Sequence, residues 1–323
     1  MDFASQEGSV HAVNHVSFDV APGELVGLVG ESGCGKSVTA SAIIGLTGMV
    51  PNASVSGSIE FQGQDLLALP EEKVRAVRGR DIAMIFQDPV TSLNPVLSIE
   101  RLMTEGLELH LGLSHADAVK RSIELLGEVG IPKAAGRIKD YPHQFSGGMR
   151  QRVMIAIALS CNPKLLLADE PTTALDVTIQ AQILSLLKKL SHEHEAAVIV
   201  ITHDLGVVAG MCRRILVMYA GRIVVRGPAK ELFRNPHHPY TVGLLKSVPR
   251  LNEPRRDTLQ TITGLPPDLA HLPPGCAFAP RCFLATDACW ESVPDLFPTD
   301  PGRHSACFHT SKLRALAPEE VVG

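Results

Sequence analysis

The sequence lacks the marks of a membrane-spanning or exported chain. No stretch approaches the roughly 20 uninterrupted apolar residues that a helix needs to cross a bilayer. Met1 to Glu7 contain neither a basic region nor an apolar run, so we expect no secretion signal. Basic residues are not in excess either, because 30 Lys and Arg stand against 34 Asp and Glu, for a net charge of −4. That balance argues against a general nucleic-acid binder.

Aromatic residues are scarce at 4%, whereas cysteine and proline are distributed unevenly. One of the seven cysteines, Cys34, lies in a glycine-rich stretch where a disulfide would be disruptive, which favours a reducing cytosol. Thirteen of the 23 prolines lie at or after Pro236, and this shift in composition predicts a domain boundary there. At 323 residues the chain is long enough for one large core plus an appended domain.

The stretch from Gly30 to Ser37 reads G-x-x-x-x-G-K-S, the pattern of a phosphate-binding loop. An apolar run suited to a buried parallel strand precedes it, and Val38 to Ile44 can continue as a helix. The glycines let backbone N–H groups surround a phosphate, Lys36 places a charge near the outer phosphates, and the Ser37 hydroxyl can bind Mg²⁺. The pattern therefore predicts a nucleotide site.

Two further apolar runs end in polar residues. Ile82 to Phe86 is followed by Gln87, and Leu165 to Ala168 is followed by Asp169 and Glu170. Strand ends of this kind bind ligands in open parallel sheets. Asp169 is suited to hold Mg²⁺ through water and Glu170 to polarise an attacking water. A third run, Ala197 to Ile201, leads to His203, which carries little weight alone.

The remaining pattern predicts strands over 9–20 and 55–61, a charged helix over 65–78, and helices between Pro95 and Pro142. After the last of these come Ser146, Gly147 and Gly148, which open another helix. An ordinary helix cap needs the serine but not two consecutive glycines, so the exposed N–H groups there suggest a second anion site.

In this order, the motifs resemble those of an ABC-type ATPase over roughly the first 235 residues. The segments 87–95 and 141–152 look closer still to the ATP-binding subunits of bacterial peptide importers, and nickel importers of the same group are similar. The signature begins with Phe145 and ends with Met149, where the general family has Leu and Gln, and that variant is usual among peptide importers.

The resemblance implies a composite site in a head-to-tail pair of ATPase domains, with ATP and Mg²⁺ between them. One partner would bind ATP through Phe3 (stacking on adenine), Ser32, Gly33, Cys34, Gly35, Lys36, Ser37 and Val38, bind Mg²⁺ through Ser37, Gln87 and Asp169, and use Glu170, His203 and Gln87 in catalysis. The other would contribute the signature residues Ser146, Gly147, Gly148 and Met149, and Asp176, which follows Thr173, Ala174 and Leu175, would lie in the dimer loop.

Four cysteines stand in the proline-rich C-terminal part: Cys276, Cys282, Cys289 and Cys307. Four clustered cysteines in a reducing compartment suggest a metal, but the tight knuckles of zinc sites are missing. A [4Fe–4S] cluster suits thiolates from a loop-rich segment, and the resemblance implies one on these four cysteines, because some relatives with this pattern carry such a cluster. Zinc, for which His304 and His309 lie close in sequence, is the alternative, and free packed thiols the third.

We therefore expect an α/β fold with a parallel core sheet, an antiparallel β subdomain and a helical insert. Residues 1–234 would form the ATPase domain, with the helical subdomain at about 95–145, and 235–323 a peptide-importer-type extension. The expected function is ATP hydrolysis that powers peptide import from the cytoplasmic face of the cell membrane. The expected partners are a second ATPase subunit, identical or related, two transmembrane permease subunits and an extracytoplasmic solute-binding protein. The alternatives are an importer of nickel or another small solute and a soluble ABC-type ATPase acting on nucleic acid or ribosomes.

Overall fold

The computed structural model describes residues 1–5, 8–173, 175–247 and 262–315. The chain divides into two compact units, each of which combines distant parts of the sequence. The first contains Met1–Asp19, Val26–Gly57 and the chain from Thr202 onward, and the second contains Val20–Leu25 and Ser58–Ile201. This division does not follow the expected boundary at residues 234 and 235, which stays a prediction. Ala174, two residues before the expected dimer-loop residue Asp176, lies outside the described residues.

The first unit is built on a mixed set of strands. β3 (Leu25–Val29) pairs in parallel with β10 (Arg214–Tyr219), and β10 pairs antiparallel with β11 (Arg222–Pro228). Two short strands near the C-terminus, β13 (Arg303–Ser305) and β12 (Phe297–Asp300), extend this set antiparallel beyond β11. The side chains of β3 and β10 are almost all buried, as expected of apolar strands covered on both faces.

The N-terminal strands of the first unit are antiparallel and differ from the prediction. β1 (Asp2–Ser5) pairs with β2 (Gly8–His11) and with β4 (Ala53–Ser54). The described backbone forms no strand between Ala12 and Glu24, so the expected strands over 9–20 are wrong beyond His11. Side chains from His15 to Val20 do alternate between exposed and half-buried positions. The alternating pattern there reflects burial on one side of a segment that belongs to no ladder.

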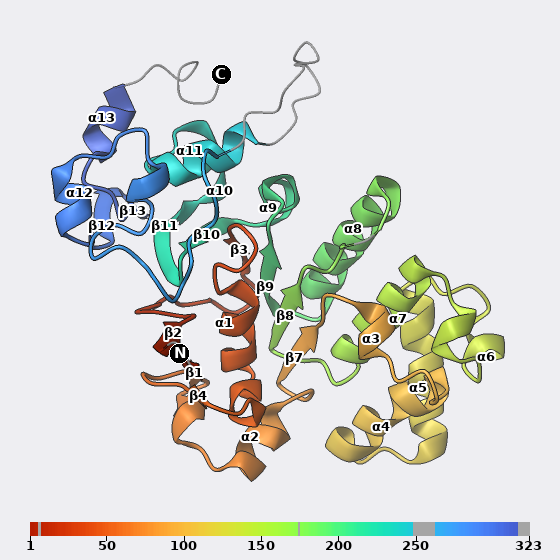
Figure 1. The fold of residues 1–323 in the computed structure, drawn as a ribbon. Coiled ribbons are helices and arrows are strands. Elements are labelled where there is room, and N and C mark those ends of the chain that lie inside the picture. The colour runs from red at the N-terminus through yellow and green to blue at the C-terminus, as the bar shows by residue number, and fades with distance from the viewer. Residues whose placement is uncertain (6–7, 174, 248–261, 316–323) are drawn as a thin grey trace. The chain divides into compact units, whose positions relative to one another are not determined.

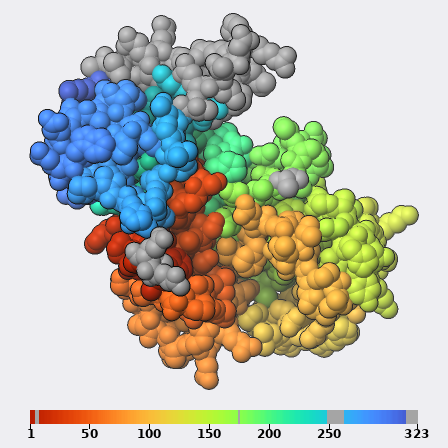
Figure 2. Space-filling view, in the orientation of Figure 1, coloured from red at the N-terminus to blue at the C-terminus, as the bar shows by residue number. Residues whose placement is uncertain are grey.

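Helices complete the first unit (Figure 1). α1 (Lys36–Ile43) follows β3, and a short 3₁₀ helix, η1 (Leu46–Met49), follows α1. The later helices are α9 (Leu205–Met211), α10 (Ala229–Arg234), α11 (Pro239–Lys246), η4 (Ala279–Arg281), α12 (Asp287–Glu291) and α13 (Thr310–Ala315). Figure 2 shows the C-terminal residues, in blue, as one contiguous mass.

The second unit contains three parallel strands, β7 (Ile82–Ile85), β8 (Leu165–Asp169) and β9 (Ala197–Thr202), with β8 in the middle. All six residues of β9 are buried, so these strands lie in the core of the unit. α7 (Gly147–Leu159) precedes β8 along the chain, and α8 (Val177–Glu193) lies between β8 and β9 in sequence. The parallel register brings the carboxyl ends of β8 and β9 together, with Asp169 opposite Ile201.

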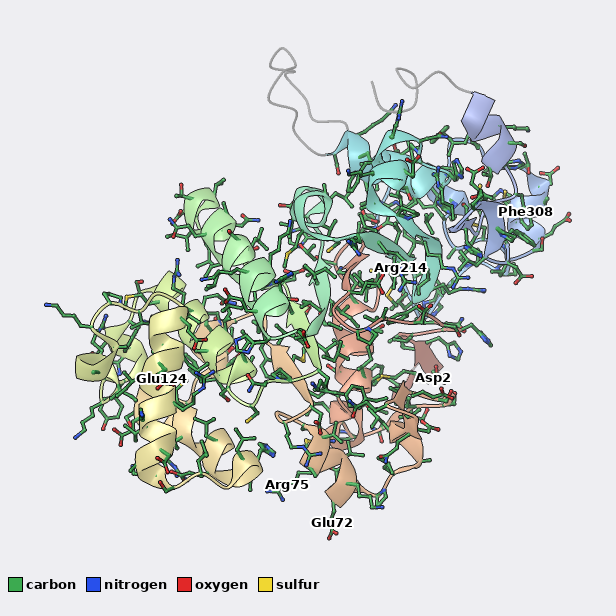
Figure 3. All side chains as sticks on the ribbon, turned by 180° about the vertical axis from the view of Figure 1, so that it is seen from behind. Asp2, Glu72, Arg75, Glu124, Arg214 and Phe308 are labelled. Carbon is green, nitrogen blue, oxygen red and sulfur yellow. The ribbon has the colours of Figure 1, made fainter. Side chains whose placement is uncertain are left out.

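Four helices of the second unit gather into a bundle, as predicted for the region near 95–145. α4 (Ile99–Leu111) and α5 (His115–Glu128) pack on each other and on α7, and α6 (Ala134–Arg137) packs on α5 (Figure 1). Ser98 and Ser114 cap the first two, each accepting a hydrogen bond from a backbone N–H three residues later. Glu124 of α5, labelled in Figure 3, pairs with Arg121 at 3.3 Å on an exposed face.

The rest of the second unit departs from the prediction in its lengths. The expected helix over 65–78 is a 3₁₀ turn, η2 (Leu66–Ala68), followed by α2 (Glu71–Val77), because Pro70 interrupts it. The expected strand over 55–61 shrinks to β5 (Glu60–Phe61), paired with β6 (Gln64–Asp65). α3 (Pro89–Ser92) and η3 (Pro142–Gln144) are single turns. The predicted α/β class, with parallel core strands, antiparallel β strands and a helical part, is confirmed.

No helix of the described residues is long and apolar enough to span a bilayer.

Candidate functional site

The loop between β3 and α1 has the backbone that its glycines predict. Gly33 and Gly35 have φ values of +79° and +106°, in the left-handed region that only glycine adopts easily. A Cβ on Gly35 would also lie 2.3 Å from the carbonyl oxygen of Ala12 and 2.8 Å from Cε of Met218. Side chains are therefore excluded at Gly35 both by its backbone angle and by its neighbours. The predicted strand–loop–helix arrangement is confirmed.

Lys36 is the buried cation of this loop, with 5% of its surface exposed. Its Nζ donates hydrogen bonds to the carbonyl oxygens of Gly30 at 2.8 Å and Glu31 at 2.9 Å, and lies 3.8 Å from Sγ of Cys34. Burial raises the pKa of the Cys34 thiol, although the Lys36 charge opposes the shift. The lysine is thus held inside the loop, and Ser37 follows it in the first turn of α1.

The N-terminus of α1 faces the same loop. Ser37 and Val38 belong to the first turn of this helix, whose initial N–H groups have no partners within the helix. The helix dipole places a partial positive charge at this end. The loop therefore offers a lysine, backbone donors and a hydroxyl to one anion, which is the chemistry that the sequence predicts.

Two other predicted ATP-site residues lie elsewhere in the first unit. Phe3 is half-buried in β1, opposite Val10 of β2 and Ala53 of β4. His203 is exposed and directly follows β9, in a turn where Thr202 Oγ1 accepts a hydrogen bond from the Asp204 N–H at 3.0 Å. Nothing in this arrangement tests adenine stacking by Phe3 or catalysis by His203, so both roles stay predictions.

The second unit brings two predicted catalytic residues into contact. Gln87 Nε2 donates a hydrogen bond of 2.9 Å to Oε2 of Glu170, and Oγ1 of Thr173 donates one of 2.8 Å to the same oxygen. Glu170 has a φ of +43°, an unusual backbone for a residue with a side chain. Its backbone N–H is bonded to the carbonyl of Ile201 at 2.8 Å. The carboxylate is therefore aimed by its neighbours, and the sequence analysis gave Thr173 no such role.

Asp169 is the last residue of β8 and is 95% buried. It immediately precedes Glu170, so one carboxylate belongs to the strand and the other to the turn that follows. β7 ends two residues before Gln87 and lies directly beside β8. Gln87 and Glu170, which follow two neighbouring strands, are thus in direct contact.

The start of α7 is a glycine pair behind a serine cap, with Gly147 exposed and Gly148 half-buried. Ser146 accepts a hydrogen bond of 3.4 Å from the Met149 N–H, and Gly147 and Gly148 form the first turn. A Cβ on Gly148 would lie 2.9 Å from Cγ2 of Ile179, so this glycine permits close packing against α8. The two glycines thus keep the N–H groups accessible while the helices pack closely, which suits an anion site.

Arg137, a neighbour of this helix start, was not assigned by the sequence analysis. The Arg137 guanidinium lies 4.1 Å from the centroid of the Phe145 ring and bonds to Sδ of Met149 at 3.6 Å. Asp176 caps α8 by accepting a hydrogen bond of 2.9 Å from the Ile179 N–H. The contacts of Asp176 are therefore those of a helix cap, and its role in a dimer stays a prediction.

The four C-terminal cysteines line one small pocket of the first unit, together with His238 and His309. All four are free thiols. Cys282 Sγ accepts a hydrogen bond of 3.4 Å from the Leu284 N–H, and Cys307 Sγ one of 3.3 Å from the His309 N–H. Phe308, labelled in Figure 3, also lines this pocket. The predicted ligand set requires that these four sulfur atoms, up to 31 positions apart in sequence, lie at one pocket, and they do.

The surroundings raise the pKa of three of these thiols, those of Cys276, Cys282 and Cys307. Burial first, and then the neighbouring thiols, raise the pKa of Cys307 to about 12 and that of Cys282 to about 11, and burial raises the pKa of Cys276. Across the described ranges, no three His, Cys, Asp or Glu side chains are placed so that they could hold one metal ion. His304 lies outside the pocket, where its Nε2 is 3.1 Å from the Arg226 guanidinium. The predicted cluster is therefore not supported by the arrangement of the side chains and stays a prediction.

An ion pair that the sequence analysis missed joins this C-terminal segment to the phosphate loop. Arg281 Nη1 and Nη2 donate to the two carboxylate oxygens of Glu31 at 2.6 and 2.9 Å. The Glu31 N–H donates to the hydroxyl of Tyr240 at 2.8 Å. The partners are 250 and 209 positions apart in sequence, and no local pattern predicts such a pairing.

Aromatic packing holds the tyrosine in place. The rings of Tyr219, Tyr240 and Phe278 lie with centroids 4.6 to 5.4 Å apart. His238 caps α11 by accepting a hydrogen bond of 3.1 Å from the Tyr240 N–H at Nδ1. Burial lowers the pKa of His238 to about 4, so the ring is neutral near pH 7 and Nδ1 is free to accept.

Comparison with known proteins finds similarity along most of the chain. Residues 13–173 match the family model described as ABC transporter, and residues 226–289 match that of the oligopeptide/dipeptide transporter C-terminal region. The oligopeptide transport ATP-binding protein OppD of Salmonella typhimurium is 53% identical over 306 residues, covering 95% of this chain and 90% of the relative. A putative peptide import ATP-binding protein of Brucella melitensis is 51% identical, covering 97% and 96%.

Solved structures are also similar. The dimeric ATP-binding cassette MJ0796 bound to ADP and Pi matches with a TM-score of 0.63 and 29% identity, covering 71% of this chain and 95% of that chain. CbiO1 of Clostridium perfringens, part of an ABC transporter complex, matches with a TM-score of 0.60 and 28% identity, covering 72% and 88%.

Proposed function

The chain belongs to the ATP-binding proteins of ABC transporters, and we propose that it hydrolyses ATP to power the import of peptides through a separate membrane channel. The observation that carries the proposal is that similarity extends through both regions: the cassette and the C-terminal region typical of oligopeptide and dipeptide transporters. The resemblance found from the motifs is confirmed, and the peptide substrate is proposed from the names of the relatives.

The chemistry of the described residues supports the assignment of roles. Lys36 and the N–H groups of the loop would bind the phosphates of ATP, with Ser37, Gln87 and Asp169 holding Mg²⁺. Glu170 would orient and deprotonate the attacking water, since its carboxylate is already aimed by Gln87 and Thr173. Mg²⁺ would neutralise phosphate charge in the transition state.

The second anion site supports a paired arrangement. Ser146, Gly147 and Gly148 would present their N–H groups to ATP bound by a second ATPase subunit, identical or related. Gln87 and the helices of the 95–145 region would contact two transmembrane permease subunits, with an extracytoplasmic binding protein completing the importer. The chain would act from the cytoplasmic face of the membrane as a peripheral subunit. A soluble ATPase acting on nucleic acid or ribosomes is not favoured by the relatives.

Copurification and stimulation test this function. The chain is expected to copurify with membrane-spanning subunits encoded beside it, and peptide-loaded binding protein should stimulate ATP hydrolysis by the assembled complex in vesicles. Lys36→Ala serves as the control without hydrolysis. If Ni²⁺ rather than peptide stimulates ATP hydrolysis by the complex, the proposal of a peptide substrate is wrong. A chain that hydrolyses ATP equally well alone and never joins membrane subunits would favour the soluble class.

We further propose that the C-terminal pocket holds a [4Fe–4S] cluster through Cys276, Cys282, Cys289 and Cys307, with zinc as the alternative. The proposal rests on the donors themselves, because four sulfurs line one pocket and two of them accept backbone N–H bonds of the kind that stabilise bound thiolates. The side chains would have to move to hold one metal ion, since no three of the described ligand side chains are now placed to do so. Such a cluster would cross-link a segment with little regular structure.

Metal analysis separates the possibilities. Anaerobically purified protein should contain iron and absorb visible light, and Cys282→Ser should lose both while the matched buried control, Cys161→Ser, keeps them. A folded sample that is colourless and free of iron would exclude the cluster, and stoichiometric zinc in that sample would identify the alternative.

A further inference from the structure

We infer that Arg281 and Tyr240 position the phosphate loop for ATP by holding Glu31, and that they are positioning residues for the ATPase reaction. Both residues come from the C-terminal segment, outside the residues that match the ABC transporter model. The inference rests on the proposed role of the Gly30–Ser37 loop in binding ATP. It assigns to the C-terminal segment a function at the nucleotide site in addition to any function of the cysteine pocket.

The first support is the geometry of the ion pair. Both guanidinium nitrogens of Arg281 meet both carboxylate oxygens of Glu31, and such bidentate pairs fix orientation as well as distance. The Arg281 side chain is only 5% exposed and that of Glu31 is 25% exposed. A pair shielded in this way is screened far less by water and salt than a surface pair.

Arg281 is itself fixed from other directions. Its Nε donates to the carbonyl of Thr263 at 3.1 Å, and its Nη1 lies 3.4 Å from the hydroxyl of Tyr219. The pair with Glu31 raises the pKa of the guanidinium, which keeps it charged at every accessible pH. Because Nε and Nη1 of Arg281 also have partners outside the loop, the guanidinium is held in place and can restrain Glu31.

The second support is that every polar group of Glu31 is held. Its carboxylate is bound by Arg281, its N–H by the Tyr240 hydroxyl, and its carbonyl oxygen by Nζ of Lys36. The carbonyl contact joins the C-terminal segment to Lys36 through the single residue Glu31. A displacement of Glu31 would therefore displace the lysine that is proposed to bind the outer phosphates.

The loop has reason to need outside support. Gly30, Gly33 and Gly35 have positive φ values, and glycine has more backbone freedom to lose than any other residue. Glu31 lies between two of these flexible points, and restraining it reduces the conformations open to the loop before ATP binds. Preorganisation of this kind strengthens binding without adding a contact to the ligand.

Nucleotide affinity of the full-length protein tests the inference. Arg281→Ala is expected to raise the Kd for MgATP, and the KM for ATP in the assembled complex, by about tenfold with kcat changed less than about twofold, as for a loss of ground-state binding. Arg281→Lys should restore only part of the affinity, because an ammonium cannot make the bidentate pair. Tyr240→Phe, which removes only the hydroxyl, should weaken binding by a smaller factor.

Arg303→Ala provides the matched control. Arg303 is a buried arginine of the same segment that donates to the carbonyl of Asn235 and lies 3.6 Å from Asp300. Its loss disturbs the segment but should leave the Kd for MgATP unchanged. An equal weakening by Arg303→Ala and Arg281→Ala would reduce the effect to general destabilisation and overturn the inference.

A double-mutant cycle asks whether Arg281 acts through Glu31. If it does, Glu31→Ala with Arg281→Ala should weaken ATP binding no more than the more damaging single change, whereas independent effects would add. Additive losses, or unchanged affinity in Arg281→Ala, would overturn the inference. Lys36→Ala distinguishes failure of the proposed ATP site from failure of the positioning role. If Lys36→Ala binds ATP normally, the proposed ATP site is wrong. If Lys36→Ala loses ATP binding while Arg281→Ala keeps it, only the positioning role is wrong.

Discussion

Replacing Glu170 by Gln is expected to lower ATP turnover by at least about a hundredfold, the usual minimum contribution of a general base, while MgATP still binds. The amide cannot take a proton from the attacking water. Its carbonyl oxygen can still accept the hydrogen bonds from Gln87 and Thr173, so the shape of the site should persist. Single-turnover hydrolysis and a separate measurement of nucleotide affinity would check both halves of this expectation.

The chain provides a closely matched control for that change. Glu195 is an exposed glutamate that also has a left-handed backbone, with φ of +53°, but it precedes β9 rather than following β8. Glu195→Gln makes the same chemical change at the opposite end of the parallel strands and should leave turnover unchanged. Normal hydrolysis in Glu170→Gln would show that another group accepts the proton.

Gly35→Ala is expected to weaken MgATP binding by about a hundredfold, or about 2.7 kcal/mol. The new Cβ would lie 2.3 Å from the Ala12 carbonyl oxygen, at a residue with φ of +106°, so the loop backbone must shift. A shift at this position moves Lys36, the next residue, away from its present hydrogen bonds. Calorimetric titration with MgATP would measure the loss.

Gly33→Ala separates steric clash from backbone strain. Gly33 also has a left-handed φ, +79°, but a Cβ there would meet no atom within 4 Å. The free-energy cost of Gly33→Ala is then the backbone strain alone, about 1–2 kcal/mol. If Gly33→Ala and Gly35→Ala weaken binding equally, the contact with Ala12 does not shape the loop. Thermal unfolding of both variants shows whether either change acts on the whole unit rather than on the loop.

Local patterns predicted the elements around the phosphate loop, β8 and β9 correctly because strong signals coincide there. Apolar runs long enough to be buried strands are followed by glycines or carboxylates that stop them, as at Gly30 and Asp169. The prediction of strands from alternating side chains failed after His11, where burial alternates from His15 to Val20 but the backbone joins no strand. Periodicity reports which side of a segment is covered, and pairing depends on what lies beside it.

The candidate site was predictable to the extent that its residues lie in contiguous motifs. Lys36, Gln87 and Glu170 each lie within a few residues of a recognisable strand end or glycine-rich turn. The restraint on Glu31 could not be found in this way, since Arg281 and Tyr240 are more than 200 positions distant and carry no local signature. The sequence analysis named Thr173 only as a neighbour of Asp176. Its hydrogen bond to Glu170 could not be predicted, because that bond depends on the geometry of the turn after β8.

The ion pair at Glu31 has a consequence for how this chain can be dissected. A cut after Arg234 would separate the cassette from its appended region along the line where the composition changes. Such a fragment would retain every nucleotide motif. It would lose Tyr240 and Arg281, two of the three residues described above as holding Glu31 through hydrogen bonds. The cassette therefore depends on residues encoded after Arg234 to support its phosphate loop.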